Sequence, residues 1–355
     1  MTNNLARTGA ISRRDLIGRS IGLLTASALP AAAVAQTGDD GLYTPAVSLA
    51  IDRGLSSLVA RQIADGSFGD GRGTGLGRNV AVVSLAGLAM LSRGSLPDRG
   101  PHGAALDRCV DYIADACEDE TGFIIRRESV SRGAMYGHGF ATLFLAEVYG
   151  TSDRKDLQRK LNNAVDLIVR SQNSEGGWRY EPEPRDADLS VTICQMMALR
   201  AARNAGTFVP GETIERAVDY VRRCQNPDGG FMYQLTGGES RFPLTAGAIV
   251  ALQNAGRYRG KELDDGYDFL SNRAGHNFSP QRNNYFFYAH YYSVQALWQR
   301  GGSDWKAWYE QLRDILLSAQ LNDGSWLDYT DRTYATAMAC IILNTPRSLL
   351  PIFQR

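Results

Sequence analysis

Two carboxylates stand close together in the segment that follows Trp178. Asp186 and Asp188 are separated by one residue, and an apolar run, residues 191–199, begins shortly after them. Neighbouring like charges raise the pKa of one member of such a pair, which is the property that a general acid needs near neutral pH. An Asp just before a helix also serves as an N-cap, where it accepts backbone N–H groups. Acid catalysis and helix capping are therefore the two interpretations of Asp188.

A second group of side chains stands at the starts of the other apolar runs. Aligning these runs places Asn79, Asp188, Arg241 and Arg332 at one level, to within about a residue. A positive charge within about 4–6 Å of a carboxylate lowers its pKa. The alignment therefore predicts that Arg241 and Arg332 keep Asp188 ionised, which would make it a poor general acid.

Aromatic and histidine side chains lie within about a turn of the same level. Aromatic faces suit an isoprenoid chain or a carbocation, and they suit ordinary helix packing equally well. No histidine stands near a cysteine at metal-ligand spacing, so we predict no metal site and no cofactor. The predicted ligand-binding residues are Tyr136, His138, Arg241, Tyr288, His290, Tyr291, Arg332 and Tyr334.

The elements that position these residues belong to a repeat. A seven-residue phrase begins with Gln and ends with an acid, Gly, a small residue and an aromatic. Its clearest copies are residues 62–68, 172–178, 225–231 and 320–326, and weaker copies end at Phe123 and Phe278. The six aromatics are 55, 55, 53, 47 and 48 residues apart. A period this regular indicates one supersecondary unit repeated along the chain.

Each unit has an amphipathic helical pattern before the phrase and an apolar run after it. A helix that is apolar all round is buried on all sides, so the runs after the phrases predict inner helices. An open stack of such units would need polar caps at its two ends, and neither end unit is more polar than the middle ones. We therefore predict an all-α fold, a closed α/α toroid of six helix pairs, over residues 45–355.

Composition and the N-terminus bound the function further. The chain has 355 residues and a net charge of zero, which argues against a nucleic-acid partner. No apolar run after residue 40 approaches the roughly 20 residues of a membrane span. Residues 1–35 combine Arg13–Arg14, an apolar stretch and the small-residue site Ala33–Ala35, in the order of a twin-arginine signal peptide. We predict export to the periplasm or medium, with residues 36–44 as a linker.

The phrase and its period resemble the repeats of squalene–hopene cyclases and of the β subunits of protein prenyltransferases. The resemblance extends to exported bacterial single-toroid members of that superfamily, and it covers roughly residues 45–355. In cyclases of this type a D-x-D-D motif after one phrase starts a carbocation cascade. The resemblance implies Asp188 as the acid and Asp186 as its neighbour, but Leu189 replaces the last Asp. The Asp-x-Cys zinc pair of the prenyltransferases is absent, so a zinc prenyltransferase is not expected.

Three functional hypotheses follow from these patterns. The first is a toroid that binds an isoprenoid-type apolar ligand in its central cavity, whether or not it catalyses a reaction. The second is a non-catalytic protein-binding or scaffold toroid, and the third is an acid-initiated terpene cyclase that uses Asp188. The state of the cavity discriminates between the first two, because a scaffold toroid would have its centre filled by side chains.

Overall fold

The computed structural model describes residues 41–69, 75–129, 133–273, 285–347 and 349–354. The predicted signal peptide, residues 1–35, and most of the predicted linker lie outside the described residues, as does most of the weak phrase that ends at Phe278. Residues Asp39–Arg355 form one unit. In its described part no helix is long and apolar enough to cross a membrane.

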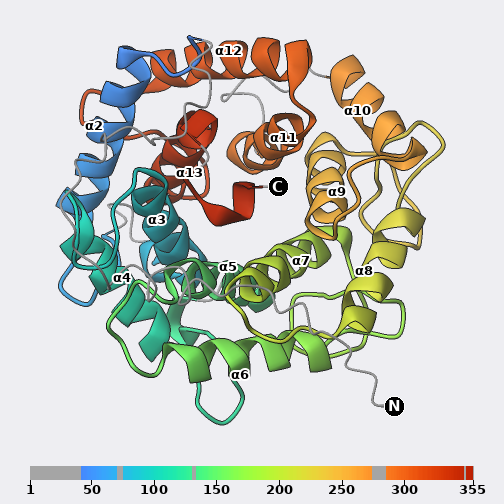
Figure 1. The fold of residues 1–355 in the computed structure, drawn as a ribbon, viewed down its shortest axis with the longest axis horizontal. Helices are drawn as coiled ribbons and strands as arrows, with labels where there is room; N and C mark the ends of the chain where they lie inside the picture. The colour runs from blue at the N-terminus through green and yellow to red at the C-terminus, as the bar shows by residue number, and fades with distance from the viewer. Residues whose placement is uncertain (1–40, 70–74, 130–132, 274–284, 348, 355) are drawn as a thin grey trace, which may run out of the picture. The chain divides into compact units, whose positions relative to one another are not determined.

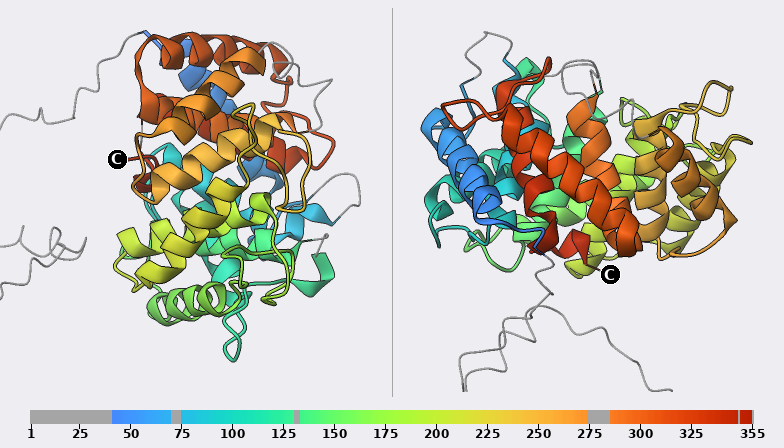
Figure 2. Two further views of the ribbon diagram at one scale, coloured as in Figure 1. Left: turned by 90° about the vertical axis from the view of Figure 1, so that its right-hand side faces the viewer. Right: turned by 90° about the horizontal axis from the view of Figure 1, so that it is seen from above.

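Helices of this unit alternate between an outer and an inner ring (Figure 1). The outer helices are α2 (Pro45–Arg61), α4 (Gly103–Asp115), α6 (Leu157–Arg170), α8 (Gly211–Arg223), α10 (Lys261–Arg273) and α12 (Gly302–Ala319). The inner helices are α3 (Val80–Ser92), α5 (Ala134–Val148), α7 (Leu189–Asn204), α9 (Phe242–Asn254), α11 (Phe286–Arg300) and α13 (Arg332–Asn344). Side views place the two rings at one level (Figure 2).

Short 3-10 helices complete the described elements: η1 (Leu76–Arg78), η2 (Arg127–Ser129), η4 (Thr345–Arg347) and η5 (Pro351–Phe353). Each inner helix contacts its two neighbours in the inner ring, and α13 contacts both α2 and α3. The predicted closed toroid is confirmed by these contacts, because the last helices of the chain meet the first ones. The count of six pairs for the whole chain stays a prediction.

The burial of the two helix types follows their sequences. In α3 every residue except Ala81 is buried, as the all-round apolar pattern predicts. In α12 the buried residues are Trp305, Trp308, Tyr309, Leu312 and Leu316, and the other residues of that helix are partly or fully exposed. Outer helices therefore turn one face inward, and inner helices are enclosed by neighbours.

The seven-residue phrases join consecutive repeats. In each clear copy the Gln side-chain amide donates to the carbonyl of the phrase glycine and to a carbonyl in the first turns of the next outer helix. At the phrase glycine a Cβ atom would lie 2.2–2.4 Å from a backbone oxygen of that helix. The phrase acid accepts a backbone N–H of the turn at Asp65, Asp228 and Asp323. In the copy that contains Glu175, Asn173 Oδ1 accepts the turn N–H groups instead.

The same contacts close the ring between its first and last repeats. Gln320 Nε2 donates to Ala50 O and to Gly324 O, both at 2.8 Å. Arg53 Nη2 returns hydrogen bonds to Leu321 O at 3.0 Å and Asn322 O at 3.1 Å. The phrase aromatic Trp326 is 1% exposed, and its indole N–H donates to Leu316 O at 2.7 Å. Residues about 270 positions apart in the chain are thus joined as neighbouring repeats are elsewhere.

We predict that Gly324→Ala destabilises the ring far more than a matched glycine substitution. Gly324 has φ +82°, and a Cβ there would lie 2.4 Å from Arg53 O. Gly206 has φ +90° with nothing within 4 Å of its Cβ position, so Gly206→Ala measures the backbone strain alone, about 1–2 kcal/mol. Overlap with α2 should add roughly 1–3 kcal/mol. Equal losses of melting temperature in the two variants would contradict the closure role of Gly324.

Candidate functional site

A cavity of about 780 Å³ opens at the N-terminal ends of the inner helices. Its volume lies within the range of roughly 300–1,000 Å³ that is typical of small-molecule sites. The apolar part of its wall comes from Val80, Val82, Leu85, Phe140, Leu244 and Met338. The rest is rich in tyrosine and carries a few charged side chains. The centre of the ring is therefore hollow at this end.

Four of the predicted ligand-binding residues line this cavity: Tyr136, Arg241, Tyr288 and Tyr334. The other four lie outside its lining. Arg332 forms an ion pair with Asp323, with Nη1 2.9 Å from Oδ2. The Tyr291 ring is buried against Tyr292.

The two predicted histidines are buried among helices. His138 Nδ1 accepts the Ile124 N–H at 3.1 Å, so the proton lies on Nε2, which is 3.1 Å from Ala164 O. Burial lowers the pKa of His138 to about 4, and the ring is neutral at physiological pH. The His290 ring contacts Phe242, Phe286 and Trp308. Both side chains hold the wall together rather than face the cavity.

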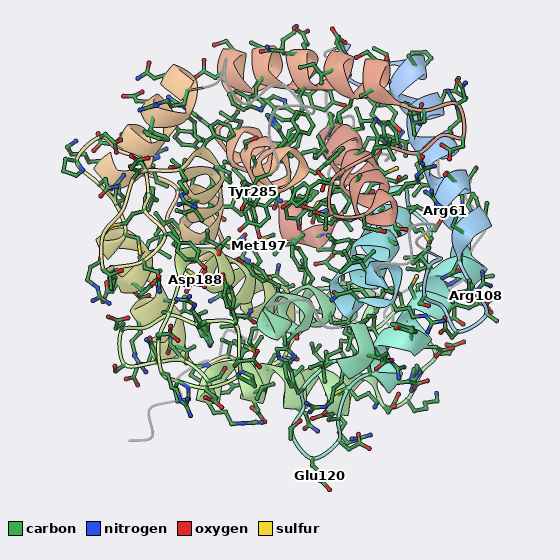
Figure 3. All side chains as sticks on the ribbon, turned by 180° about the vertical axis from the view of Figure 1, so that it is seen from behind. Arg61, Arg108, Glu120, Asp188, Met197 and Tyr285 are labelled. Atoms are coloured by element: carbon green, nitrogen blue, oxygen red, sulfur yellow. The ribbon has the colours of Figure 1, made fainter. Side chains whose placement is uncertain are left out.

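Asp188 is the N-cap of α7. Its Oδ1 accepts the Val191 N–H at 3.0 Å and the Ser190 hydroxyl at 2.5 Å, and its own N–H donates to Trp178 O at 2.9 Å. The side chain is fully buried and does not line the cavity. In Figure 3 Asp188 lies by the outer side of α7, whereas Tyr285 lies nearer the middle of the ring.

A hydrogen-bonded chain links Asp188 to the cavity wall. The Ser190 hydroxyl donates to Asp188, and the same oxygen is hydrogen-bonded to the hydroxyl of Tyr136, which lines the cavity. Ser190 has one hydroxyl proton, so Tyr136 donates to Ser190. The Tyr136 oxygen thereby keeps its lone pairs for another donor. Because Ser190 itself lines the cavity, one hydroxyl separates Asp188 from that space.

Two parts of the electrostatic prediction for Asp188 are wrong: its pKa is raised rather than lowered, and the paired cation is neither Arg241 nor Arg332. That Asp188 is ionised at neutral pH stays a prediction. Burial raises its pKa, and the hydrogen bonds from Ser190 and Val191 and the charge of Arg179 oppose that rise. The charge that lowers its pKa most is Arg179, whose Nε is 3.5 Å from Asp188 Oδ2. Arg179 also pairs with the exposed Asp186, with Nη1 3.1 Å from Oδ2. One arginine therefore bridges the two carboxylates.

Arg332 lies one residue after the N-cap of α13, which explains why it does not face Asp188 as predicted. Asp331, not Arg332, is the N-cap of α13, and its Oδ1 accepts the N–H groups of Thr333 and Tyr334. The capping level of the inner helices therefore contains Asn79, Asp188, Arg241 and Asp331. Arg332 is thus one residue past the capping position, which is within the tolerance of about a residue given for the aligned level.

Sequence reasoning missed a second set of cavity residues. The position two residues after a phrase aromatic lines the cavity as Ile125, Tyr180, Tyr233 and Asp328. That fixed offset is a signal the sequence contains. Asp328 is the one carboxylate among the described lining residues. Its Oδ1 accepts the Thr330 N–H at 2.8 Å, and burial, followed by the charge of Asp331, raises its pKa.

Comparison with known proteins fits this geometry. The model of the prenyltransferase alpha-alpha toroid domain matches residues 46–178 and 84–284. The chain belongs to this family. It is 32% identical over 109 residues to drimenyl diphosphate synthase of Streptantibioticus cattleyicolor, covering 31% of this chain and 20% of that one. It is 29% identical over 177 residues to the enzyme of that name from Streptomyces showdoensis, covering 49% and 30%. The match thus spans less than a third of these relatives.

Solved structures share the toroid fold. The type II terpene cyclase MstE from Scytonema superposes with a TM-score of 0.59 at 15% identity, over 86% of this chain and 100% of that one. An alpha-1,6-mannanase of Salegentibacter sp. HEL1_6 also gives 0.59, at 9% identity, over 85% and 99%. Identities this low establish the fold alone. The chain therefore shares its fold with a terpene cyclase and with a mannanase, and its ligand must be argued from its own cavity.

We predict that Asp188→Asn becomes less harmful to stability as the pH rises. Because folding raises the pKa of Asp188, its contribution to stability is greatest below the ordinary carboxyl pKa and is lost as pH rises through the folded value. Asn keeps the cap but does not titrate. Melting temperatures of both proteins between pH 4 and 8 test this, since other groups cancel in the difference. A difference that moves in favour of the natural Asp with rising pH would contradict the raised pKa.

Proposed function

We propose that the cavity binds an isoprenoid-type apolar molecule. The observation that carries the proposal is the hollow end of the ring, about 780 Å³, with an apolar wall on α3, α5, α9 and α13 and tyrosines around it. A scaffold toroid has no need of such a space. Two comparisons favour an isoprenoid chain over other apolar ligands. The relatives of the chain include drimenyl diphosphate synthases, and the terpene cyclase MstE is known in complex with geranylgeranyl dihydroxybenzoate.

The lining also separates this proposal from glycoside hydrolysis, an activity of another protein with this fold. Glycoside hydrolysis generally uses two carboxyl groups that flank the bond to be cleaved. Among the described lining residues Asp328 is a single carboxylate. An apolar wall with one carboxylate suits a hydrocarbon chain better than a polysaccharide.

The role of Asp188 as a cyclase acid gains little support from its position. An acid that protonates an alkene must reach the substrate within hydrogen-bond distance. Asp188 lies behind the cavity-lining Ser190, and its Oδ1 already accepts two hydrogen bonds. Its Oδ2 has no hydrogen-bond partner among the described residues, but it is buried 3.5 Å from Arg179 Nε and outside the cavity lining. We therefore propose binding as the function and treat acid-initiated cyclisation by Asp188 as the alternative that the experiment must address.

We predict that farnesol binds and that filling the cavity abolishes its binding. Ala81 lines the cavity and is half-buried, so Ala81→Trp should weaken farnesol by at least about tenfold. Leu49→Trp, at a position 61% exposed on α2, adds similar bulk outside and should change nothing. Isothermal titration measures both. Equal affinity for all three proteins, or no farnesol binding to the natural chain, would remove the proposal and favour the scaffold toroid.

Product analysis belongs in the same experiment. Farnesol, geranylgeraniol and squalene are incubated with the natural protein and with Asp188→Asn, and extracts are examined by gas chromatography with mass spectrometry. Unchanged substrates are the expected result. A cyclic product that disappears in Asp188→Asn would establish the cyclase alternative.

We also propose export by the twin-arginine route. The support is the order of charged, apolar and small residues in positions 1–35. The expected result in a bacterial host is a periplasmic protein that begins at Gln36, while Arg13→Lys with Arg14→Lys stays in the cytoplasm at full length. Cell fractionation followed by N-terminal sequencing checks this. A periplasmic double variant would contradict the twin-arginine route.

A further inference from the structure

One corner of the cavity wall is built from hydroxyl side chains of three consecutive repeats. These residues, which we call the hydroxyl corner, are Tyr136, Tyr180, Ser190 and Tyr233. Backbone hydrogen bonds between repeats hold the segments that carry them. The Met135 N–H donates to Tyr180 O and the Leu189 N–H donates to Tyr233 O, both at 2.9 Å. The backbone of the corner is therefore fixed by contacts between repeats.

Most hydroxyl protons of the corner are used within the protein. Ser190 Oγ donates to Asp188 Oδ1 at 2.5 Å, so the Tyr136 hydroxyl is the donor in its hydrogen bond to Ser190. The Tyr180 and Tyr233 hydroxyls are 2.5 Å apart, and their hydrogen bond uses one of their two protons. Each hydroxyl offers one proton and two lone pairs. One proton from Ser190, one from Tyr136 and one from the tyrosine pair make three of the four, whereas most lone pairs stay open.

The direction of this hydrogen-bond chain does not depend on the charge of Asp188. Its Oδ1 accepts the Val191 N–H at 3.0 Å as well as the Ser190 hydroxyl. Its Oδ2 has no hydrogen-bond partner among the described residues, so this oxygen is the one that takes a proton when the carboxyl group is neutral. Ser190 then still donates to Oδ1. Tyr136 therefore donates to Ser190 in both states, and its own oxygen is left with lone pairs only.

We propose that the hydroxyl corner selects a ligand whose polar end is a hydroxyl group, so that the cavity binds an isoprenoid alcohol. The inference rests on the proposal that the cavity binds an apolar molecule, and it adds the head group of that molecule. An alcohol donates its proton to the lone pairs of Tyr136 or Ser190. An aldehyde of the same chain brings only lone pairs of its own, so it leaves these acceptors without a donor.

The arginines of the cavity mark the alternative position for the polar end. Arg126 and Arg241 line the cavity outside the corner. An arginine has donors and no acceptor, so it favours a carbonyl or an anion. The corner is the better candidate because its hydrogen bonds are already in place. The Arg126 guanidinium instead lies 4.7 Å from the centroid of the Tyr112 ring, and Arg241 is exposed to solvent.

Farnesol and farnesal are the probes that separate these two positions. They share one carbon chain and differ in a single group, a hydroxyl in farnesol and a carbonyl in farnesal. Isothermal titration of the natural protein with each ligand measures the preference. We expect farnesol to bind roughly three- to tenfold more tightly, which is the effect of one hydrogen bond.

Variants assign the preference to the corner. Tyr136→Phe together with Ser190→Ala removes the two acceptor oxygens, so farnesol should weaken by roughly three- to tenfold while farnesal stays within about twofold. Tyr136→Phe alone should weaken farnesol in the same direction, and it keeps the Ser190 contact to Asp188 if the double variant does not fold. Tyr258→Phe removes a hydroxyl at an exposed position outside the cavity lining and should change neither affinity. Melting temperatures check that each variant is folded.

The contrary results distinguish the two proposals. Equal affinities for farnesol and farnesal in the natural protein would overturn selection by the corner and leave the apolar-ligand proposal intact. A preference for farnesal would place the polar end at the arginines and would also overturn it, as would a double variant that keeps the natural preference for farnesol. Binding of neither ligand would remove the apolar-ligand proposal and the head-group inference with it.

Discussion

The ring depends on a backbone-to-backbone contact that recurs in each described repeat. A phrase glycine lies so close to the next outer helix that a side chain there would overlap a carbonyl oxygen, and the positive φ of that glycine turns the chain away from its own outer helix. In the clear copies the Gln side-chain amide donates hydrogen bonds to two carbonyls, one in the phrase and one in the next outer helix. Neither contact depends on the identity of the neighbouring side chains. The angle between successive repeats is therefore set by main-chain geometry, which allows the last repeat to meet the first.

Closure at this joint determines where the cavity lies. Once the outer helices are fixed, the segment after each phrase aromatic runs inward to the start of an inner helix, and the residue two positions after the aromatic reaches the cavity. The inner helices are buried along most of their length. The cavity lies at their N-terminal ends. Polar side chains gather there because the first N–H groups of each helix need acceptors. Capping and cavity lining thus share one level of the structure.

The fold was predictable because the residues that define each repeat make their contacts within the repeat and with the next outer helix. A glycine, an amide and a buried aromatic at fixed spacing specify the same joint wherever they occur, and apolar runs specify inner helices. The site was less predictable, since it depends on which side of a short segment faces inward. Arg179 follows Trp178 directly, yet only the folded turn brings it to Asp188. In the last repeat a shift of one residue exchanged Asp331 for Arg332, and with it the sign of the charge assigned to the capping level.

Two carboxyl groups with raised pKa show why such a shift alone does not locate a function. Burial is the largest cause for both Asp188 and Asp328. Asp188 Oδ1 accepts hydrogen bonds from two donors of α7, the Val191 N–H and the Ser190 hydroxyl, so capping of α7 explains the position of this oxygen. Asp328 accepts a turn N–H on one oxygen and stands in the cavity wall, among rings from a different repeat. Asp188 Oδ2 is buried with no hydrogen-bond partner among the described residues and lies 3.5 Å from Arg179 Nε, whereas Asp328 lines the cavity. Access to the cavity, rather than a raised pKa, therefore separates the carboxyl that a cavity ligand can reach from the one that caps a helix.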